Sequence, residues 1–133
     1  LKPEPWNRMT ELASKAETTP AINEVFFGAQ YPSPDSFFYS QYHSRAKGTW
    51  ASMEWVLDDE IDAWIDEARG TGDIVAQNAI YKKIQSKLAN TQSDVYVLTQ
   101  ISQQAFSNCL EGFAWVPMMS FEFNFYNMKW VCN

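Results

Sequence analysis

Residues 26–38 read Phe-Phe-Gly-Ala-Gln-Tyr-Pro-Ser-Pro-Asp-Ser-Phe-Phe, a stretch that joins a predicted strand to a predicted helix through a proline-rich elbow, residues 28–34. Ser33 is a favourable N-cap residue, Pro34 suits the first helical turn, and the carboxylate of Asp35 complements the positive end of the helix dipole. Ligands often bind at strand-to-helix turns of this kind. We therefore expect side chains of the elbow to lie at the mouth of a ligand cleft.

The same stretch resembles the family-5 extracellular solute-binding proteins, the peptide, nickel and oligosaccharide receptors of bacterial ABC importers. The shared features are a strand ending in an aromatic residue, then a small residue, Ala, a polar residue, Tyr and a proline-containing turn. The likeness continues in the family's order through residues 59–69, 80–88 and 110–113. It implies an α/β fold, namely the C-terminal lobe segment of a two-lobed periplasmic-binding-protein (type II) fold with a mixed sheet flanked by helices.

The resemblance also implies a domain organisation and a role. Residues 1–102 would form the C-terminal ligand-binding lobe segment, and residues 103–133 the crossover and tail that return to the other lobe. The whole receptor would bind a small peptide-like or neutral oligosaccharide-like ligand between its lobes, and an ABC permease in the membrane would recognise the closed form. Its location would be periplasmic, or extracellular with a lipid anchor; the given residues contain no signal-peptide pattern.

The candidate ligand-binding residues are Phe27, Gly28, Gln30, Tyr31, Trp6 and Trp50. Aromatic side chains offer flat apolar faces, and the Gln30 amide offers a donor and an acceptor without charge, which suits polar but uncharged ligands. In the family's peptide receptors the position of Gln30 is typically an Asp that pairs with the peptide's α-amino group. An amide compensates the desolvation of an ammonium less well, so we expect neutral ligands rather than free peptide N-termini. Core packing is the alternative role for Phe27, and attachment of a loop to the body is the alternative for Trp50.

Composition excludes several other classes. The 133 residues suffice for one domain, and no run approaches the roughly 18 apolar residues of a membrane helix. A net charge of -6 with scattered Lys and Arg disfavours a nucleic-acid partner. The aromatic content of 16% exceeds what so small a core can bury, so some rings are expected to line a cleft or an interface.

Few residues are available for catalysis. His43 is the only histidine, and its place at a predicted helix end favours a capping role, so we expect no enzyme activity, no metal and no cofactor. The acidic residues of the 58–67 segment are expected to form a solvated face, because the first turn of a helix favours acids. Cys109 and Cys132 would either pair in an oxidising compartment or remain small buried thiols, and the sequence leaves both open.

The expected elements follow the periodicity of apolar residues. A short helix is predicted from Pro5 and is expected to end before Thr19, and further helices are predicted after Ser33, over 59–69 and over 73–88. The last two are expected to form a hairpin with these residues inward: Ile61, Trp64, Ile65, Ala68, Ile80, Tyr81, Ile84 and Leu88. Strands are predicted over 22–27, over 94–101, buried on both faces, and through Phe121, Phe123 and Phe125. Residues 44–55 are predicted to form an apolar loop.

Two other functions remain open. One is a free-standing protein- or glycan-interaction domain that uses exposed aromatic residues, and the other is a hydrolase built around His43. The tail from Gly112 to Val131 is rich in aromatic residues and Met. We expect it to fold back onto the lobe or to drive self-association of this chain.

Overall fold

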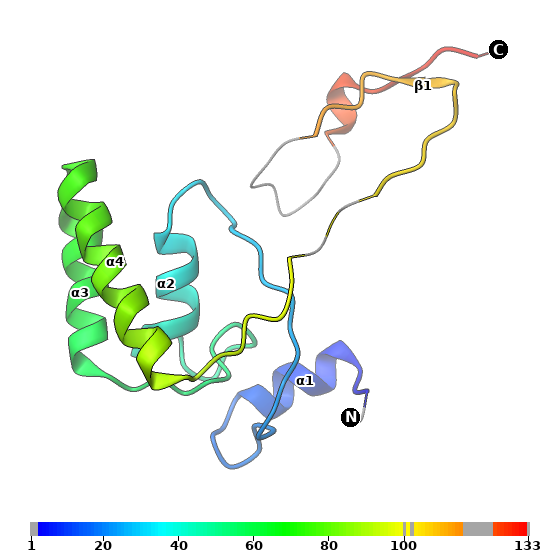
Figure 1. Ribbon diagram of the computed structural model, residues 1–133. Coiled ribbons are helices and arrows are strands. Elements are labelled where there is room, and N and C mark those ends of the chain that lie inside the picture. Colours follow the sequence, from blue (N-terminus) through cyan, green and yellow to red (C-terminus); the bar gives the residue numbers. More distant parts are fainter. Residues whose placement is uncertain (1–2, 100, 102, 116–123, 133) are drawn as a thin grey trace.

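The computed structural model describes residues 3–99, 101, 103–115 and 124–132. Within these ranges, helices form the body of the molecule, and an arm, the described residues between Thr91 and Leu110, leads from the last long helix to a small hairpin near the C-terminus (Figure 1). None of the helices in this part of the chain is long and apolar enough to cross a membrane.

The two short helices begin where the sequence predicts. Helix α1 spans Trp6–Ala13 and follows Pro5, and helix α2 spans Asp35–Tyr42 at the end of the elbow. The hydroxyl of Ser33 accepts a hydrogen bond from the backbone N–H of Asp35 at 3.3 Å. The helix start was therefore predicted to within one residue, since Pro34 and not Ser33 is the N-cap and the helix begins at Asp35.

The two longer helices form the predicted hairpin. Helix α3 spans Asp59–Gly70 and helix α4 spans Ile74–Thr91, and they lie side by side (Figure 1). The side chain of Asp58 accepts hydrogen bonds from two N–H groups in the first turn of α3, and Asp73 does the same for α4. Across the connection, the Gln77 amide donates to a carbonyl oxygen in the last turn of α3 at 2.9 Å. These bonds satisfy helix-end groups that would otherwise lack partners.

Helices α2, α3 and α4 enclose the core. Phe38 on α2 stacks on Tyr81 of α4 with ring centroids 5.2 Å apart. Trp64 is half-buried against the core instead of within it. The helical period of the apolar residues thus predicted the inward faces of the hairpin. The buried members of this core are Phe38, Tyr42, Ile61, Ile65, Ala68, Ile80, Tyr81, Ile84 and Leu88.

The connection between α2 and α3 is the predicted loop, with one 3-10 turn, η1, over Ser44–Ala46. Met53 is buried, and the indole N–H of Trp55 donates to the hydroxyl of Thr19 at 2.9 Å. Trp55 has a φ of 51°, in the left-handed region that large side chains rarely adopt. Apolar side chains therefore attach this loop to the body, at the expense of local backbone strain.

Two predicted strands are absent. The described residues of the segments 22–27 and 94–101 are irregular and pair with no strand in the part of the chain that the structure describes. Val95 and Val97 are 85% and 80% exposed, so the prediction of a strand buried on both faces was wrong. Their β-branched composition suits pairing, but a strand needs a neighbouring strand and a surface to cover it. Neither is present around these segments within the described ranges.

The C-terminal hairpin contains a small antiparallel sheet. Strand β1, Leu110–Glu111, pairs with β2, Lys129–Trp130, and the N–H of Val131 donates to the carbonyl of Cys109 at 2.8 Å. A disulfide joins Cys109 to Cys132 beside this pair. The alternative of two unpaired thiols is therefore excluded.

The third predicted strand falls largely outside the described residues, because Phe121 and Phe123 lie there. Phe125 is described and begins a 3-10 turn, η2, over Phe125–Asn127, so a strand through this residue was not the correct prediction. Taken at a coarse level, the chain is a small helix-rich domain with a two-stranded sheet, which agrees with the α/β class. The mixed sheet flanked by helices is not seen in the ranges described.

Candidate functional site

The elbow is fixed by hydrogen bonds of its own backbone. The N–H of Gln30 donates to the hydroxyl of Ser36, which is fully buried, at 2.8 Å. The N–H of Ser33 donates to the carbonyl of Tyr31, also at 2.8 Å. The side chain of Gln30 is exposed at this rigid turn. It is therefore free to reach a ligand, while its backbone is held in place.

Three of the predicted aromatic residues lie together. The ring of Trp50 is 5.3 Å from that of Trp6 and 5.5 Å from that of Phe27, between ring centroids. Phe37, at the exposed side of α2, adds a further contact with Phe27 at 5.5 Å. We call Trp6, Phe27, Phe37 and Trp50 the aromatic cluster. It joins α1, the segment before the elbow, α2 and the loop before α3.

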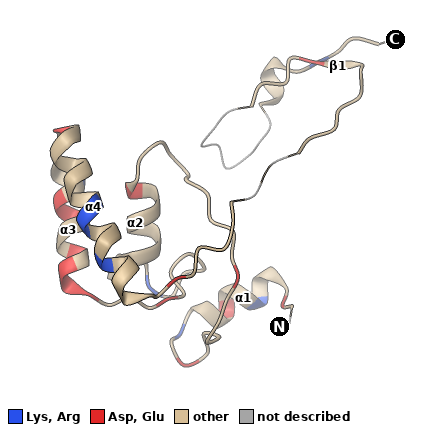
Figure 2. Cartoon of the chain, viewed as in Figure 1, with Lys and Arg blue, Asp and Glu red and all other residues tan. Residues whose placement is uncertain are grey.

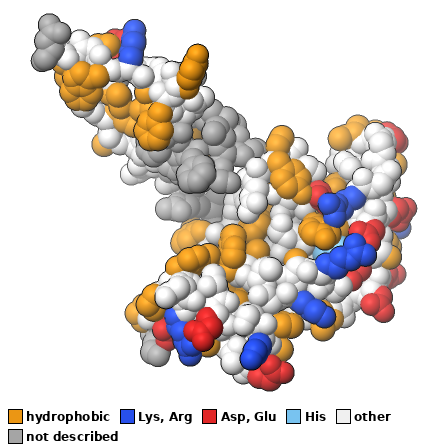
Figure 3. All heavy atoms as spheres, turned by 180° about the vertical axis from the view of Figure 1, so that it is seen from behind, with side chains coloured by type: hydrophobic (Ala, Val, Ile, Leu, Met, Phe, Trp, Pro, Cys, Tyr) orange, Lys and Arg blue, Asp and Glu red, His pale blue; other side chains and the backbone are white. Residues whose placement is uncertain are grey.

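The aromatic cluster is only partly buried. Trp6 is 57% exposed, whereas Phe27 and Trp50 are half-buried. A space-filling view shows hydrophobic side chains in several groups on the surface of the helical body and on the hairpin (Figure 3). The cluster therefore packs the body together and still presents ring faces to solvent. Both roles considered for Phe27, packing and contact with a ligand, agree with this placement.

Tyr31 lies apart from the aromatic cluster. Its hydroxyl donates to Oδ2 of Asp35 at 2.5 Å, and Nε of Arg69 lies 3.4 Å from Oδ1 of the same carboxylate. Burial and the hydrogen bond to Asp35 raise the pKa of Tyr31 to about 12. Tyr31 therefore ties the elbow to α2 and α3. Gly28 is exposed, and a Cβ at this position would meet no atom within 4 Å.

A pocket lies on the other side of the elbow, between α2, α4 and the start of the arm. Its volume is about 680 Å³. No pattern in the sequence predicted it, because its walls come from two helices, the elbow and the arm, and periodicity does not show that these segments meet. Phe37 connects it to the aromatic cluster, since this ring lines the pocket and also contacts Phe27. The lining residues are Ala29, Pro32, Ser33, Pro34, Phe37, Phe38, Gln41, Tyr42, Gln85, Leu88, Ala89 and Tyr96.

The arm is held to the body beside this pocket. The hydroxyl of Tyr42 lies 2.9 Å from Oδ2 of Asp94 and 2.9 Å from the hydroxyl of Tyr96. Burial raises the pKa of Tyr42, which keeps this hydroxyl protonated as a donor. Glu54 is close to Asp94, and its buried Oε2 has no hydrogen-bond partner in the part of the chain that the structure describes. Burial raises the pKa of Glu54 to about 7, and the charge of Asp94 adds to this shift.

His43 caps helix ends, as predicted. Its backbone N–H donates to a carbonyl of α2, and its Nδ1 accepts the N–H of Arg45 at 3.1 Å. The imidazole is 2% exposed and lies between Asp62 and Asp66, at 3.5 Å and 3.4 Å. Such a buried ring does not meet a substrate from solvent, so the hydrolase alternative gains no support here.

Asp62 differs from the expectation of a solvated acidic face. Its carboxylate accepts hydrogen bonds from the backbone N–H and the hydroxyl of Ser44, which joins η1 to α3. Buried polar groups of this kind need such partners. Among the residues that the structure describes, no group of three or more His, Cys, Asp and Glu could hold a metal ion.

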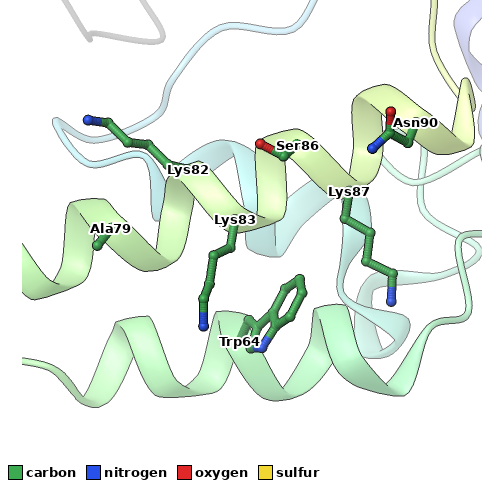
Figure 4. A pocket seen from close by; sticks show the side chains of 7 residues that line it. All are labelled: Trp64, Ala79, Lys82, Lys83, Ser86, Lys87 and Asn90. Carbon is green, nitrogen blue, oxygen red and sulfur yellow. The ribbon is translucent and has the colours of Figure 1, made fainter.

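A shallow pocket of about 510 Å³ lies on the outer side of the α3–α4 hairpin (Figure 4). The ammonium groups of Lys83 and Lys87 lie 5.4 Å and 5.5 Å from the centre of the Trp64 ring, whereas Lys82 points away from it. Lys87 also contacts the carboxylates of Asp58 and Glu60, each at 2.7 Å. Acidic positions gather on α3 and lysine positions on the neighbouring α4 (Figure 2). This surface is occupied by its own ion pairs and cation–π contacts.

No family model, curated protein or solved structure matches the chain.

Proposed function

We propose that this chain is the C-terminal part of a solute-binding component of an ABC importer, which captures a small neutral solute and catalyses no reaction. The observation that carries the proposal is the meeting of Trp6, Phe27 and Trp50 next to a rigid elbow with an exposed Gln30. Aromatic faces bind the apolar faces of sugars and of peptide side chains, and a neutral amide adds one donor and one acceptor.

The absence of charge on these four side chains favours an uncharged ligand. A peptide ammonium placed beside Gln30 would lose its hydration without gaining a carboxylate partner. We therefore infer a neutral oligosaccharide, or a peptide whose amino terminus is blocked, as the class of ligand.

The proposed mechanism is closure of two lobes around the ligand, followed by recognition of the closed form by a membrane permease outside the cytoplasm. Residues 1–102 would contribute the lobe that carries the aromatic cluster, and residues 103–133 would return to the other lobe. Exposed apolar side chains in the segments 22–27 and 94–98 support this view, because they need a covering surface; they are Ile22, Phe26, Val95, Val97 and Leu98. The second lobe would supply that surface.

The test is ligand binding by the protein at its native length. Thermal-shift screening would compare neutral oligosaccharides with free and N-acetylated peptides of two to five residues, and calorimetry would then measure the affinity of the best ligand. We expect Phe27→Ala and Gln30→Ala to weaken binding by roughly 1–3 kcal/mol, because each removes a ring contact or a hydrogen bond. Phe26→Ala is the matched control, since Phe26 is exposed and adjacent but is not part of the aromatic cluster.

Two results would contradict the proposal. One is unchanged affinity and an unchanged melting temperature in both variants. The other is a submicromolar peptide that loses its affinity on N-acetylation, which would mean that an acidic group elsewhere binds the amino terminus.

A free-standing interaction domain is the second candidate. It is favoured by the aromatic side chains that the disulfide-linked hairpin exposes, among them Trp115, Tyr126 and Trp130. A protein or glycan partner that binds normally when Phe27 and Gln30 are replaced, but not when Trp130 is, would favour this candidate.

A further inference from the structure

We propose that the pocket between the elbow, α2 and α4 is a second binding site, which takes an uncharged and largely apolar small molecule. The inference does not depend on the receptor function, because it rests on the walls of this pocket alone. The volume of about 680 Å³ lies within the range of small-molecule sites, about 300–1,000 Å³.

The floor of the pocket belongs to the core. Phe38, Tyr42 and Leu88 line it, and all three are buried. Ala29, Pro32 and Pro34 form the opposite wall on the elbow. Because the core and the elbow backbone are fixed by packing and hydrogen bonds, these two walls are in place before any ligand arrives. A preformed site loses less conformational entropy on binding.

The polar groups of the lining are neutral. Gln41 on α2 and Gln85 on α4 both line the pocket, and within the described residues neither side-chain amide has a hydrogen-bond partner. Among the described residues, no charged side chain is part of the lining. An ion would therefore lose its hydration here without gaining a counter-charge, whereas a neutral molecule could bury its apolar part and bond the two amides. This contrast defines the class of ligand.

Tyr96 supplies the last wall, and the body holds it in position. Its ring lines the pocket, and its hydroxyl lies 2.9 Å from that of Tyr42. Tyr96 is otherwise exposed, so this bond sets where the ring lies. Phe37 belongs to the aromatic cluster and also lines the pocket. The two sites are therefore neighbours that share this ring.

The probe is N-phenyl-1-naphthylamine, a neutral aromatic molecule, titrated by fluorescence into the full chain. Anilinonaphthalene sulfonate, which has the same rings and a negative charge, tests the selectivity for uncharged ligands. We expect saturable one-to-one binding of the neutral probe. The sulfonate should bind at least about tenfold more weakly, because the described lining of the pocket offers no counter-charge. Equal affinity for both probes, or no saturable binding of the neutral one, would overturn the proposal.

The variants place this binding in the pocket. Ala89 is exposed on α4 and lines the pocket, so Ala89→Phe would fill it without disturbing the core and should lower the affinity at least about tenfold. Ala76→Phe is the matched control, since Ala76 is exposed on the same helix and lies outside the pocket. If circular dichroism shows that Ala89→Phe impairs folding, Ala29→Leu fills the pocket from the elbow side. Equal losses in the filling and control variants, or no loss in either, would mean that the probe binds elsewhere and would refute the assignment.

Discussion

Glu54 illustrates how one half-buried carboxyl can set the response of this protein to pH. It lies in the loop before α3, where burial raises its pKa from 4.5 to about 7 and where Asp94 adds a like charge. In the unfolded chain the same group is solvated and titrates near its ordinary value. At any pH between these two pKa values, the folded state therefore retains a proton that the unfolded state has lost.

The first prediction is that Glu54 makes the protein less stable as pH rises from about 4.5 to about 7. In this window the unfolded state binds fewer protons than the folded state, so the free energy of unfolding falls with pH and then levels off. Thermal unfolding measured across the window should show that Glu54→Gln lacks this fall. Parallel profiles of the two proteins would contradict the prediction. Lys87 lowers the pKa of Asp58, which makes stability rise with pH. Asp58 is present in both proteins, so its effect cancels when their profiles are compared.

At the residue scale the sequence predicted more of the structure than of the site. Asp73 was predicted to cap α4, and either Asp58 or Asp59 to cap α3, because acids before an apolar-periodic run commonly cap a helix. The structure shows that Asp58 caps α3 and Asp73 caps α4. Trp6, Phe27 and Trp50 were each selected for their aromatic faces, but no pattern in the sequence could show that they meet. The partner of Tyr31 could not be read either, because Asp35 was assigned only to the helix dipole.

At the scale of elements, the α3–α4 hairpin depends on its two caps unequally. Asp73 caps α4 through backbone N–H groups alone. Asp58 caps α3 and in addition binds the ammonium of Lys87 at 2.7 Å. The Asp58 side chain therefore joins the start of one helix to the last turns of the other.

The second prediction is that Asp58→Ala destabilises the protein more than Asp73→Ala. Loss of a cap costs about 1 kcal/mol, within a range of about 0.5–2 kcal/mol, and the first variant also leaves Lys87 with one carboxylate fewer. Urea unfolding followed by circular dichroism measures both. Asp59→Ala is the control, because Asp59 is exposed in the first turn and is not the cap of α3. Equal losses of unfolding free energy in all three variants would contradict the prediction, because they would show that stability depends only on the charge near the helix terminus.

The C-terminal hairpin, which contains β1 and β2, depends on one glycine. Gly112 has a φ of 83°, and a Cβ at this position would overlap the carbonyl oxygen of Asn127. The third prediction is that Gly112→Ala disrupts the β1–β2 pairing while the helical body remains folded, because the two backbones could no longer approach. Hydrogen exchange should show faster exchange at Val131 and no change in α3 and α4. Gly28→Ala is the matched control, since a Cβ there meets nothing within 4 Å. Unchanged protection of Val131 would contradict the prediction.

The failed strands show a limit of sequence patterns at this scale. Val95 and Val97 have the composition of a buried strand and are exposed. A β-branched run shows that a segment is suited to form a strand. A helix satisfies its backbone hydrogen bonds within itself, whereas a strand depends on a neighbouring strand. The period of the helices therefore predicted α3 and α4 correctly, and the same reasoning failed for residues 22–27 and 94–101.

At the scale of the whole molecule, the body and the arm differ in how completely they bury apolar surface. The helices enclose a continuous core, whereas the arm carries Val95, Val97 and Leu98 in solvent. Unpaired backbone next to exposed β-branched side chains is a template for pairing with another strand. In the proposed receptor, the second lobe would pair with this part of the arm. For the chain by itself, another copy of the chain can pair with it.

The last prediction is that this chain self-associates through the arm. Static light scattering over a range of concentrations should give a mass above that of the 15.3 kDa monomer. The double variant Val95→Lys with Val97→Lys should restore the monomer, because adjacent like charges on one edge oppose strand pairing. Thr99→Lys with Gln103→Lys is the control, since it adds the same charge at exposed positions of the arm and removes no apolar side chain. If the unmodified chain is a monomer at every concentration, the arm needs no cover, and the principal support for a second lobe is lost. If both double variants dissociate the oligomer equally, the positive charge added to the arm and not the loss of apolar side chains controls the association.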